Sequence, residues 1–297
     1  MLNSYNLSYL PEKLFNSQRP ITMRATKRYE KKISATCKII TGDKSNGTGF
    51  FCELKINNKL MKMLFTNNHV LNQFNSNIKI EHNRKRIEIN IKNRFIFTNE
   101  DLDYTAIQIL DSDNFDNFFQ IEKNINCKHP EEEYKYDEFV IIQYPGGDDV
   151  SFAEGYLNEI NDYSIFHSIN TEPGSSGSPI LLDTRHLKVI GIHCGKTKDL
   201  NRGIYMTKII EDIEKKILDK KKEFNLCKEV QRNNQQNKDI IDSSPKNIKP
   251  KKNQGKINDN KKHNQIKKFS PKRKYEYDNK EYELYSEEQF IKNKESW

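Results

Sequence analysis

Residues 171–180, TEPGSSGSPI, are the most informative segment of this chain. Glycines on both sides of a serine pair let the backbone turn tightly, so that the N–H groups of Gly174 and Ser176 can converge on one point. Two converging amides stabilise an oxyanion, and the Ser176 hydroxyl beside them is placed to attack a carbonyl carbon. An isolated glycine- and serine-rich segment is more often a plain surface turn. Here it runs directly into the apolar residues 180–182, a strand pattern, which favours the catalytic interpretation.

Two upstream segments offer the partners that a serine nucleophile needs. The hydroxyl requires a base to take its proton, and the base requires a carboxylate to hold its tautomer. In residues 64–71, LFTNNHVL, an apolar strand pattern breaks at two asparagines, and His69 follows them. In residues 103–109, DYTAIQI, Asp103 precedes a strand with alternating apolar residues. The order His69, Asp103, Ser176 predicts a catalytic triad, with Asp101 as the alternative carboxylate two residues earlier.

These segments together resemble the chymotrypsin-like serine peptidases, in particular the disulfide-free branch that includes bacterial glutamyl endopeptidases. Residues 47–51 (GTGFF) and 64–70 (LFTNNHV) are similar to G-T-G-F … L-T-N-x-H-V of that branch, and residues 103–107 (DYTAI) to D-L-A-I. Residues 174–179 (GSSGSP) and 189–193 (VIGIH) are similar to G-N-S-G-S-P … V-I-G-I-H. The resemblance covers roughly residues 33–222. It implies a serine endopeptidase that works through an acyl-enzyme on protein or peptide substrates, with Gly174 and Ser176 N–H as the oxyanion hole.

The resemblance also implies a substrate pocket. Asn170 stands where trypsin-like enzymes carry the acid that selects Arg and Lys, so cleavage after basic residues is disfavoured. Thr171 and His193 match the threonine and histidine with which glutamyl endopeptidases and picornaviral processing proteases hold a Glu or Gln side chain. The chemistry suits this role, because a hydroxyl and an imidazole N–H both donate to a carboxylate or amide oxygen. Cys194 and Gly195 would line the edge along which a substrate pairs as an added strand. The alternative is that His193 is a packed strand histidine that donates to the backbone.

Two further expectations concern pH and activation. If His193 titrates near the ordinary histidine pKa of about 6.5, preference for Glu over Gln grows as the pH falls through that value. Ser175 stands where secreted relatives carry an aspartate that a newly cut N-terminus pairs during activation. With no charge to pair, the resemblance implies a site that forms without proteolytic activation by that route.

Short apolar runs between turn residues predict an all-β fold of two six-stranded antiparallel barrels. The first barrel spans roughly residues 31–115, and the second spans 120–206. Apolar residues at helical spacing then predict a helix over residues 207–222. The peptidase domain is expected to be a monomer over residues 31–224, after an N-terminal extension, residues 1–30, with no regular period. The predicted strands are 33–41, 48–56, 59–65, 78–80, 87–91 and 105–110, then 139–144, 151–159, 163–167, 178–182, 188–194 and 203–206.

Residues 225–297 are predicted to form a disordered tail, because Lys, Asn, Gln and Ser dominate their composition. The block from Lys246 to Lys274 is basic, with Asp259 as its single acid, and can neutralise phosphates. Weak contact with nucleic acid or an acidic surface is one interpretation, and a solvated linker is the other. The end of the block, KKFSPKRK, is typical of a nuclear address. The end of the tail is acidic and rich in tyrosine.

Composition narrows the remaining possibilities. The 297 residues include 50 Lys and Arg against 42 Asp and Glu, a formal net charge of +8. The five cysteines show no metal-ligand spacing, so no metal or cofactor is expected, and they are expected to be reduced thiols. With no signal peptide and no apolar stretch near the roughly 18 residues of a membrane span, a cytoplasmic or nuclear protein is expected. The alternative function is a catalytically silent barrel that serves as a binding module, although no triad member is missing.

Overall fold

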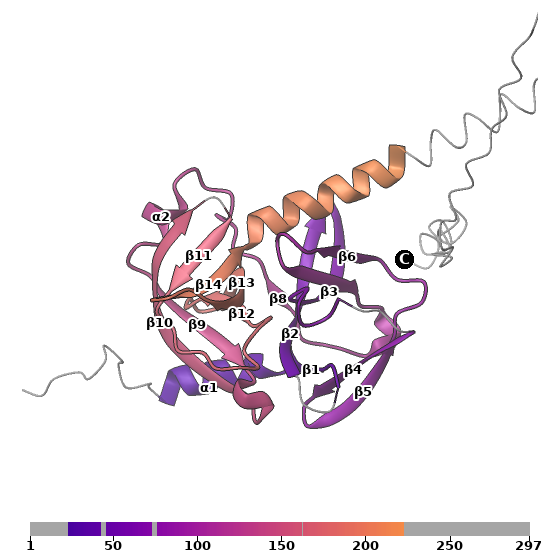
Figure 1. Ribbon diagram of the computed structural model, residues 1–297, viewed down its shortest axis with the longest axis horizontal. Helices are drawn as coiled ribbons and strands as arrows, with labels where there is room; N and C mark the ends of the chain where they lie inside the picture. Colours follow the sequence, from indigo (N-terminus) through magenta and orange to yellow (C-terminus); the bar gives the residue numbers. More distant parts are fainter. Residues whose placement is uncertain (1–22, 43–45, 73–75, 162, 223–297) are drawn as a thin grey trace, which may run out of the picture. The chain divides into compact units, whose positions relative to one another are not determined.

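The strands of the protein form two separate β-sheets (Figure 1). The computed structural model describes residues 23–42, 46–72, 76–161 and 163–222, so the predictions for residues 1–22 and for the tail lie outside it. The first sheet has eight strands in the order β5-β4-β1-β2-β3-β7-β6, with β8 paired to β2. They are β1 (Thr36–Ile40), β2 (Asn46–Ile56), β3 (Lys59–Thr66), β4 (Asn77–His82), β5 (Lys85–Asn90), β6 (Ile96–Asn99), β7 (Tyr104–Gln108) and β8 (Phe119–Gln120).

The second sheet closes on itself as a barrel of six strands in the order β10-β11-β14-β13-β12-β9. All of its pairings are antiparallel, so the predicted second barrel is confirmed. Its strands are β9 (Glu138–Gln143), β10 (Ser151–Asn161), β11 (Ser164–His167), β12 (Pro179–Leu182), β13 (Lys188–Lys196) and β14 (Asn201–Tyr205). Three short helical turns lie in the connections of the two sheets: η2 (Asp111–Asp113), α2 (Pro130–Glu133) and η3 (Pro145–Gly147).

The first sheet differs from the predicted closed barrel of six strands. It gains β6 and β8, which are too short to show a clear apolar period, and β8 pairs with β2 in parallel. Within the described residues its outer strands β5 and β6 do not pair, so the sheet is a half-barrel. Arg94 lies between these strands: its Nε donates to Asn90 O at 2.5 Å and its Nη1 to Gln108 O at 3.0 Å. One side chain thus satisfies a carbonyl at the end of β5 and another at the end of β7.

Replacing Arg94 by methionine is expected to destabilise the protein by about 3–5 kcal/mol, because the change leaves a buried carboxylate unpaired. Arg94 Nη1 and Nη2 bind the side-chain oxygens of Asp113 at 2.5 and 2.7 Å. The two side chains are only 5% and 12% exposed. Urea unfolding of the purified variant measures the loss of unfolding free energy.

The exposed ion pair of Lys62 with Asp111 is the matched control. Its Nζ–Oδ1 distance is 2.7 Å, but the side chains are 34% and 63% exposed. Water screens such a pair, so Lys62→Met is expected to cost less than about 1 kcal/mol. Similar losses in the two variants would show that burial of the Arg94 pair does not set its contribution.

The N-terminal segment contains a helix that its sequence did not predict. Helix α1 (Met23–Ile33) is mostly charged, and its few apolar residues lie on one face. It is held by Tyr29, which is fully buried and donates its hydroxyl to Glu154 while its ring packs edge-on against Phe152. Arg28 forms an ion pair with Asp183. Residues 23–30 therefore belong to the packed structure, because tertiary contacts with the second barrel stabilise a helix that local sequence alone does not specify.

The predicted C-terminal helix is confirmed over residues 206–222 and is the orange helix of Figure 1. Ile209 and Ile213 on one of its faces are fully buried. Asp212 accepts a hydrogen bond of 2.5 Å from the Tyr104 hydroxyl, and Lys216 Nζ donates to Thr98 O at 2.6 Å. The helix is thereby anchored on the first sheet. Neither this helix nor another one in the described part of the chain has the length and apolarity needed to cross a membrane.

Candidate active site

The structure brings His69 and Asp103 into direct contact. Strand β3 ends at the buried Phe65 and Thr66, the buried Asn67 follows, and His69 stands in the turn after it. His69 Nδ1 lies 2.8 Å from Asp103 Oδ2 and 3.0 Å from Oδ1, and the backbone N–H of His69 donates to Oδ1 at 3.0 Å. The carboxylate therefore holds both the ring and the backbone of the histidine. The His69 side chain remains 49% exposed, so its ring is open to solvent.

Asp103 adopts a backbone conformation that costs an L-residue energy, and its neighbours hold it there. Its φ is 47°, in the left-handed region. Its N–H donates to Glu100 O at 3.1 Å, and its carbonyl accepts from Nδ2 of the fully buried Asn67 at 2.9 Å. The alternative carboxylate, Asp101, is exposed and lies in the turn that precedes β7. The geometry favours Asp103.

The segment that carries Ser176 is bound to the first sheet through its backbone. Ser176 O accepts a hydrogen bond of 2.8 Å from Thr48 N, and Gly177 N donates to His193 O at 2.9 Å. Gly177 has a φ of 90°, and a Cβ there would lie 2.0 Å from Thr48 O. Only glycine allows so close an approach of the two chains. This glycine therefore lets the segment that carries Ser176 lie against β2.

Two peptide units in this segment carry the amides predicted for the oxyanion hole. Pro173 O accepts from Gly146 N at 2.6 Å, and Ser175 O accepts from Ser178 N at 3.1 Å. In a trans peptide the N–H points opposite to the carbonyl, so these bonds fix the directions of the following amides, those of Gly174 and Ser176. Within the described residues neither amide donates a hydrogen bond, so both are free to bind a substrate oxygen.

Ser175 also has a defined role in closing this segment. It is fully buried, its Oγ accepts from Glu172 N at 3.1 Å, and its N–H donates to Glu172 O at 3.0 Å. A neutral hydroxyl therefore closes the turn by a local hydrogen bond. No charged partner is needed to close this turn.

The predicted pocket residues lie on neighbouring segments of the second barrel. Asn170 is exposed, and its carbonyl accepts from Gln143 Nε2 at 3.1 Å. Thr171 is half-buried. Cys194 and Gly195 follow His193 along β13, where Gly195 adopts a φ of 150° and Cys194 Sγ donates to Arg202 O at 3.4 Å. Burial raises the pKa of the Cys194 thiol to about 11, and the Asp103 charge opposes its ionisation, so the thiol is uncharged at neutral pH.

His193 pairs with a second histidine that the sequence did not single out. His193 Nδ1 lies 3.2 Å from Nε2 of His167, at the end of β11, and the two side chains are almost fully buried. Burial lowers the pKa of His193 to about 4, with a smaller contribution from His69, and burial beside His193 lowers that of His167 to about 3. The signal for His167 was its inward position two residues after the buried Ile165, but its partner is visible only in the folded barrel.

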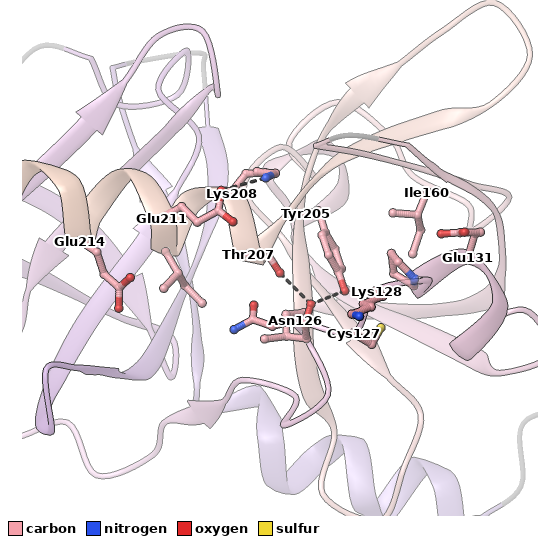
Figure 2. A pocket seen from close by; sticks show the side chains of 13 residues that line it. Asn126, Cys127, Lys128, Glu131, Ile160, Tyr205, Thr207, Lys208, Glu211 and Glu214 are labelled. Atoms are coloured by element: carbon pink, nitrogen blue, oxygen red, sulfur yellow. Dashed lines mark hydrogen bonds and ion pairs between the residues drawn. The ribbon is translucent and has the colours of Figure 1, made fainter.

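A cavity of about 440 Å³ lies elsewhere, beside the start of the C-terminal helix (Figure 2). It is lined by residues of the segment 125–131, by Ile160 and by one face of the helix, and the hydroxyls of Tyr205 and Thr207 both donate to Ile125 O there. None of the predicted site residues lines it. Within the described part of the chain, no cluster of His, Cys, Asp and Glu could hold a metal ion.

Residues 47–192 match the family model of the trypsin-like peptidase domain. No curated protein matches the chain. The chain is similar to the active form of the Rv3671c protease from M. tuberculosis, with 15% identity, a TM-score of 0.49 and coverage of 69% of this chain and 93% of that one. It is also similar to the human pathogenic astrovirus serine protease, with 18% identity, a TM-score of 0.43 and coverage of 59% of this chain and 90% of that one. The stretch that matches the family model, residues 47–192, includes His69, Asp103 and Ser176.

Proposed function

We propose that the protein is a serine endopeptidase with His69, Asp103 and Ser176 as its catalytic triad. The observation that carries the proposal is the contact of both Asp103 carboxylate oxygens with His69 Nδ1. A carboxylate at Nδ1 keeps the proton on that nitrogen, so Nε2 is the basic one and is available to accept a proton from the nucleophile. Thr48 bonds the Ser176 carbonyl to the sheet from which His69 extends, which supports the placement of the serine beside this base.

The chemistry follows from these groups. His69 Nε2 takes the proton of Ser176 Oγ while the oxygen attacks the scissile carbonyl carbon, and the Gly174 and Ser176 N–H groups stabilise the resulting oxyanion. The C–N bond then breaks, and the imidazolium returns its proton to the leaving amine. Water attacks the acyl-enzyme in the same way, with His69 again as the base, which releases the acid product and restores the Ser176 hydroxyl.

A fluorophosphonate probe tests this proposal on the full chain. It forms a covalent adduct only with a serine that an adjacent base activates. We expect mass spectrometry of the digested protein to locate the adduct at Ser176, and cleavage of a peptide library to be lost in proportion to labelling. An unlabelled protein that cleaves no peptide would instead support the silent binding module.

For the residue before the cleaved bond, we propose Gln or Glu, with Gln favoured at neutral pH. One proton lies between the two histidines, and His167 Nδ1 has no hydrogen-bond partner among the described residues. An orphaned buried N–H is rarer than an orphaned acceptor, so the shared proton belongs to His167 Nε2. His193 then carries its own proton on Nε2 and can donate it to a side-chain oxygen of the substrate. A neutral donor suits an amide better than a carboxylate, whose burial costs more.

The low pKa of His193 changes the pH dependence expected from the sequence. Because the group is uncharged above about pH 6, we expect cleavage after Gln to exceed cleavage after Glu by about tenfold there, which corresponds to ~1.4 kcal/mol. Since His193 gains a proton only near its pKa of about 4, the Glu-to-Gln ratio should rise toward that pH and not near 6.5. Values of kcat/KM for paired Gln and Glu peptides over this range measure the ratio.

Variants at two histidines complete this test. His193→Ala should reduce selectivity for Gln and Glu more than it reduces hydrolysis of a small activated ester. His129, whose side chain is 67% exposed, is the control: His129→Ala should change neither quantity. A wild-type preference for Phe, Tyr or Leu before the cleaved bond would refute this pocket and leave the serine peptidase proposal intact.

A further inference from the structure

Thr48 connects three segments of the candidate site, although it is not one of the predicted site residues. It is fully buried in β2. Its hydroxyl donates to Gly174 O at 2.8 Å and accepts from Tyr144 N at 3.1 Å. Its backbone N–H donates to Ser176 O at 2.8 Å, and its carbonyl accepts from Thr66 Oγ1 at 2.8 Å. Every polar group of this residue is therefore paired, and two of the bonds reach the nucleophile segment.

The hydroxyl acts on a backbone that could otherwise change conformation. Gly174 has a φ of 96°, and glycine reaches other backbone conformations at little cost. The Gly174 N–H is one of the two amides of the proposed oxyanion hole, and the Gly174 carbonyl belongs to the next peptide unit. Since Thr48 Oγ1 holds that carbonyl, rotation of Gly174 would break a buried hydrogen bond. The hydroxyl therefore restrains the orientation of the Gly174 amide.

The Thr48 hydroxyl also restrains the Gly174 amide through the hydrogen bond that it accepts. Tyr144 N–H donates to Thr48 Oγ1, and Tyr144 immediately precedes the turn Pro145–Gly147. Gly146 N–H in that turn donates to Pro173 O at 2.6 Å, which fixes the peptide unit that carries the Gly174 N–H. The Thr48 hydroxyl oxygen thus restrains the Gly174 carbonyl directly. Through the turn that follows Tyr144, it also supports the peptide unit that carries the Gly174 N–H.

We propose that the Thr48 hydroxyl is a positioning group for the oxyanion hole and that its loss weakens transition-state binding without disturbing the base. The inference rests on the proposed serine peptidase function. The hydroxyl touches neither His69 nor Asp103, so the proton-transfer machinery should be unaffected by its removal. The effect should appear in kcat, because the oxyanion forms only in the transition state and in the tetrahedral intermediate.

Thr48→Val removes the hydroxyl and keeps the shape of the side chain. Removal of one direct oxyanion donor costs about 10²–10³ in kcat, so an indirect loss should lower kcat by about tenfold to hundredfold, with KM nearly unchanged. Affinity for a peptide aldehyde that mimics the tetrahedral intermediate should fall by the same factor. The pH profile of kcat/KM should keep its wild-type midpoint. Titration with fluorophosphonate counts the competent sites, so the rates refer to folded enzyme only.

Conservative variants and a matched control separate positioning from stability. Thr48→Ser restores the hydroxyl and should restore kcat to within a few-fold of wild type, and Thr48→Cys, with its weaker donor, should fall between Ser and Val. Thr36→Val is the control: Thr36 is also fully buried, and its Oγ1 donates to Ile33 O at 2.7 Å. The Thr36→Val variant should lose about as much unfolding free energy as Thr48→Val and should retain the wild-type kcat.

The outcomes distinguish this inference from the function on which it rests. A wild-type chain that neither reacts with fluorophosphonate nor cleaves peptides overturns both. An active wild type whose Thr48→Val variant matches Thr36→Val in kcat and in aldehyde affinity overturns the positioning role alone. A shifted pH midpoint in Thr48→Val also overturns it, because the change would then act through His69.

Discussion

Replacement of Ser176 by alanine is expected to lower kcat by about six powers of ten, to the rate that binding and the oxyanion hole alone provide. The side chain is the proposed nucleophile, and no covalent intermediate can form without its oxygen. The backbone bond of this residue, which its carbonyl accepts from Thr48 N, involves no side-chain atom, so the fold should be retained. Single-turnover hydrolysis of a peptide ester and fluorophosphonate labelling measure the loss, and circular dichroism checks the fold.

The neighbouring serines provide the control for this assignment. Ser178 is fully buried and its Oγ has no hydrogen-bond partner among the described residues, so Ser178→Ala should cost little activity. Ser175→Ala removes only the bond from Glu172 N and should retain most of the labelling. Labelling that persists in Ser176→Ala and is lost in either of the other variants would place the nucleophile elsewhere in this segment.

Replacement of Asp103 by asparagine is expected to lower kcat by about four powers of ten, because an amide N–H facing His69 Nδ1 stabilises the wrong tautomer of the ring. The shape of the side chain is kept, and the backbone bonds from Asn67 and to Glu100 do not depend on its charge. The loss should therefore appear in the rate at saturating substrate and not in the unfolding free energy. Steady-state kinetics together with thermal unfolding separate the two effects.

Asp101→Asn is the matched control for this change, since Asp101 is exposed and two residues away. It should retain at least about a third of the wild-type kcat, as expected for a surface substitution away from the site. If Asp101→Asn were instead the more damaging change, the carboxylate assignment would be wrong and the turn before β7 would carry a different partner of His69.

The parts of the site that the sequence predicts are those that lie in short contiguous motifs. The serine segment, the turn with His69 and the residue before β7 each combine a turn signal with an apolar strand, so local pattern and chemistry agree. The barrel strands follow from the same alternation. Helix α1 is mostly charged with only a few apolar residues, and it is stabilised by Tyr29 through contacts with the second barrel.

Features that depend on pairing between distant strands could not be read from the chain. His167 and His193 meet because β11 and β13 both pair with β14, and no local motif records this order. The low pKa of His193 follows from its burial, so the titration near 6.5 expected from its residue type is wrong. Arg94 is similar: its sequence position marks a turn, but the carbonyl groups that it satisfies belong to strands that fail to pair.

Each of the two helices at the ends of the described structure packs against the half of the molecule to which it is not directly connected in sequence. Helix α1 directly precedes β1 of the first sheet, but its buried contacts reach Glu154 and Asp183 of the second barrel. The helix of residues 206–222 follows β14 of the barrel and is anchored on Thr98 and Tyr104 of the first sheet. Each half is thus tied down by a segment that continues from the other. A hinge opening between the two halves would have to break the contacts of both helices at once.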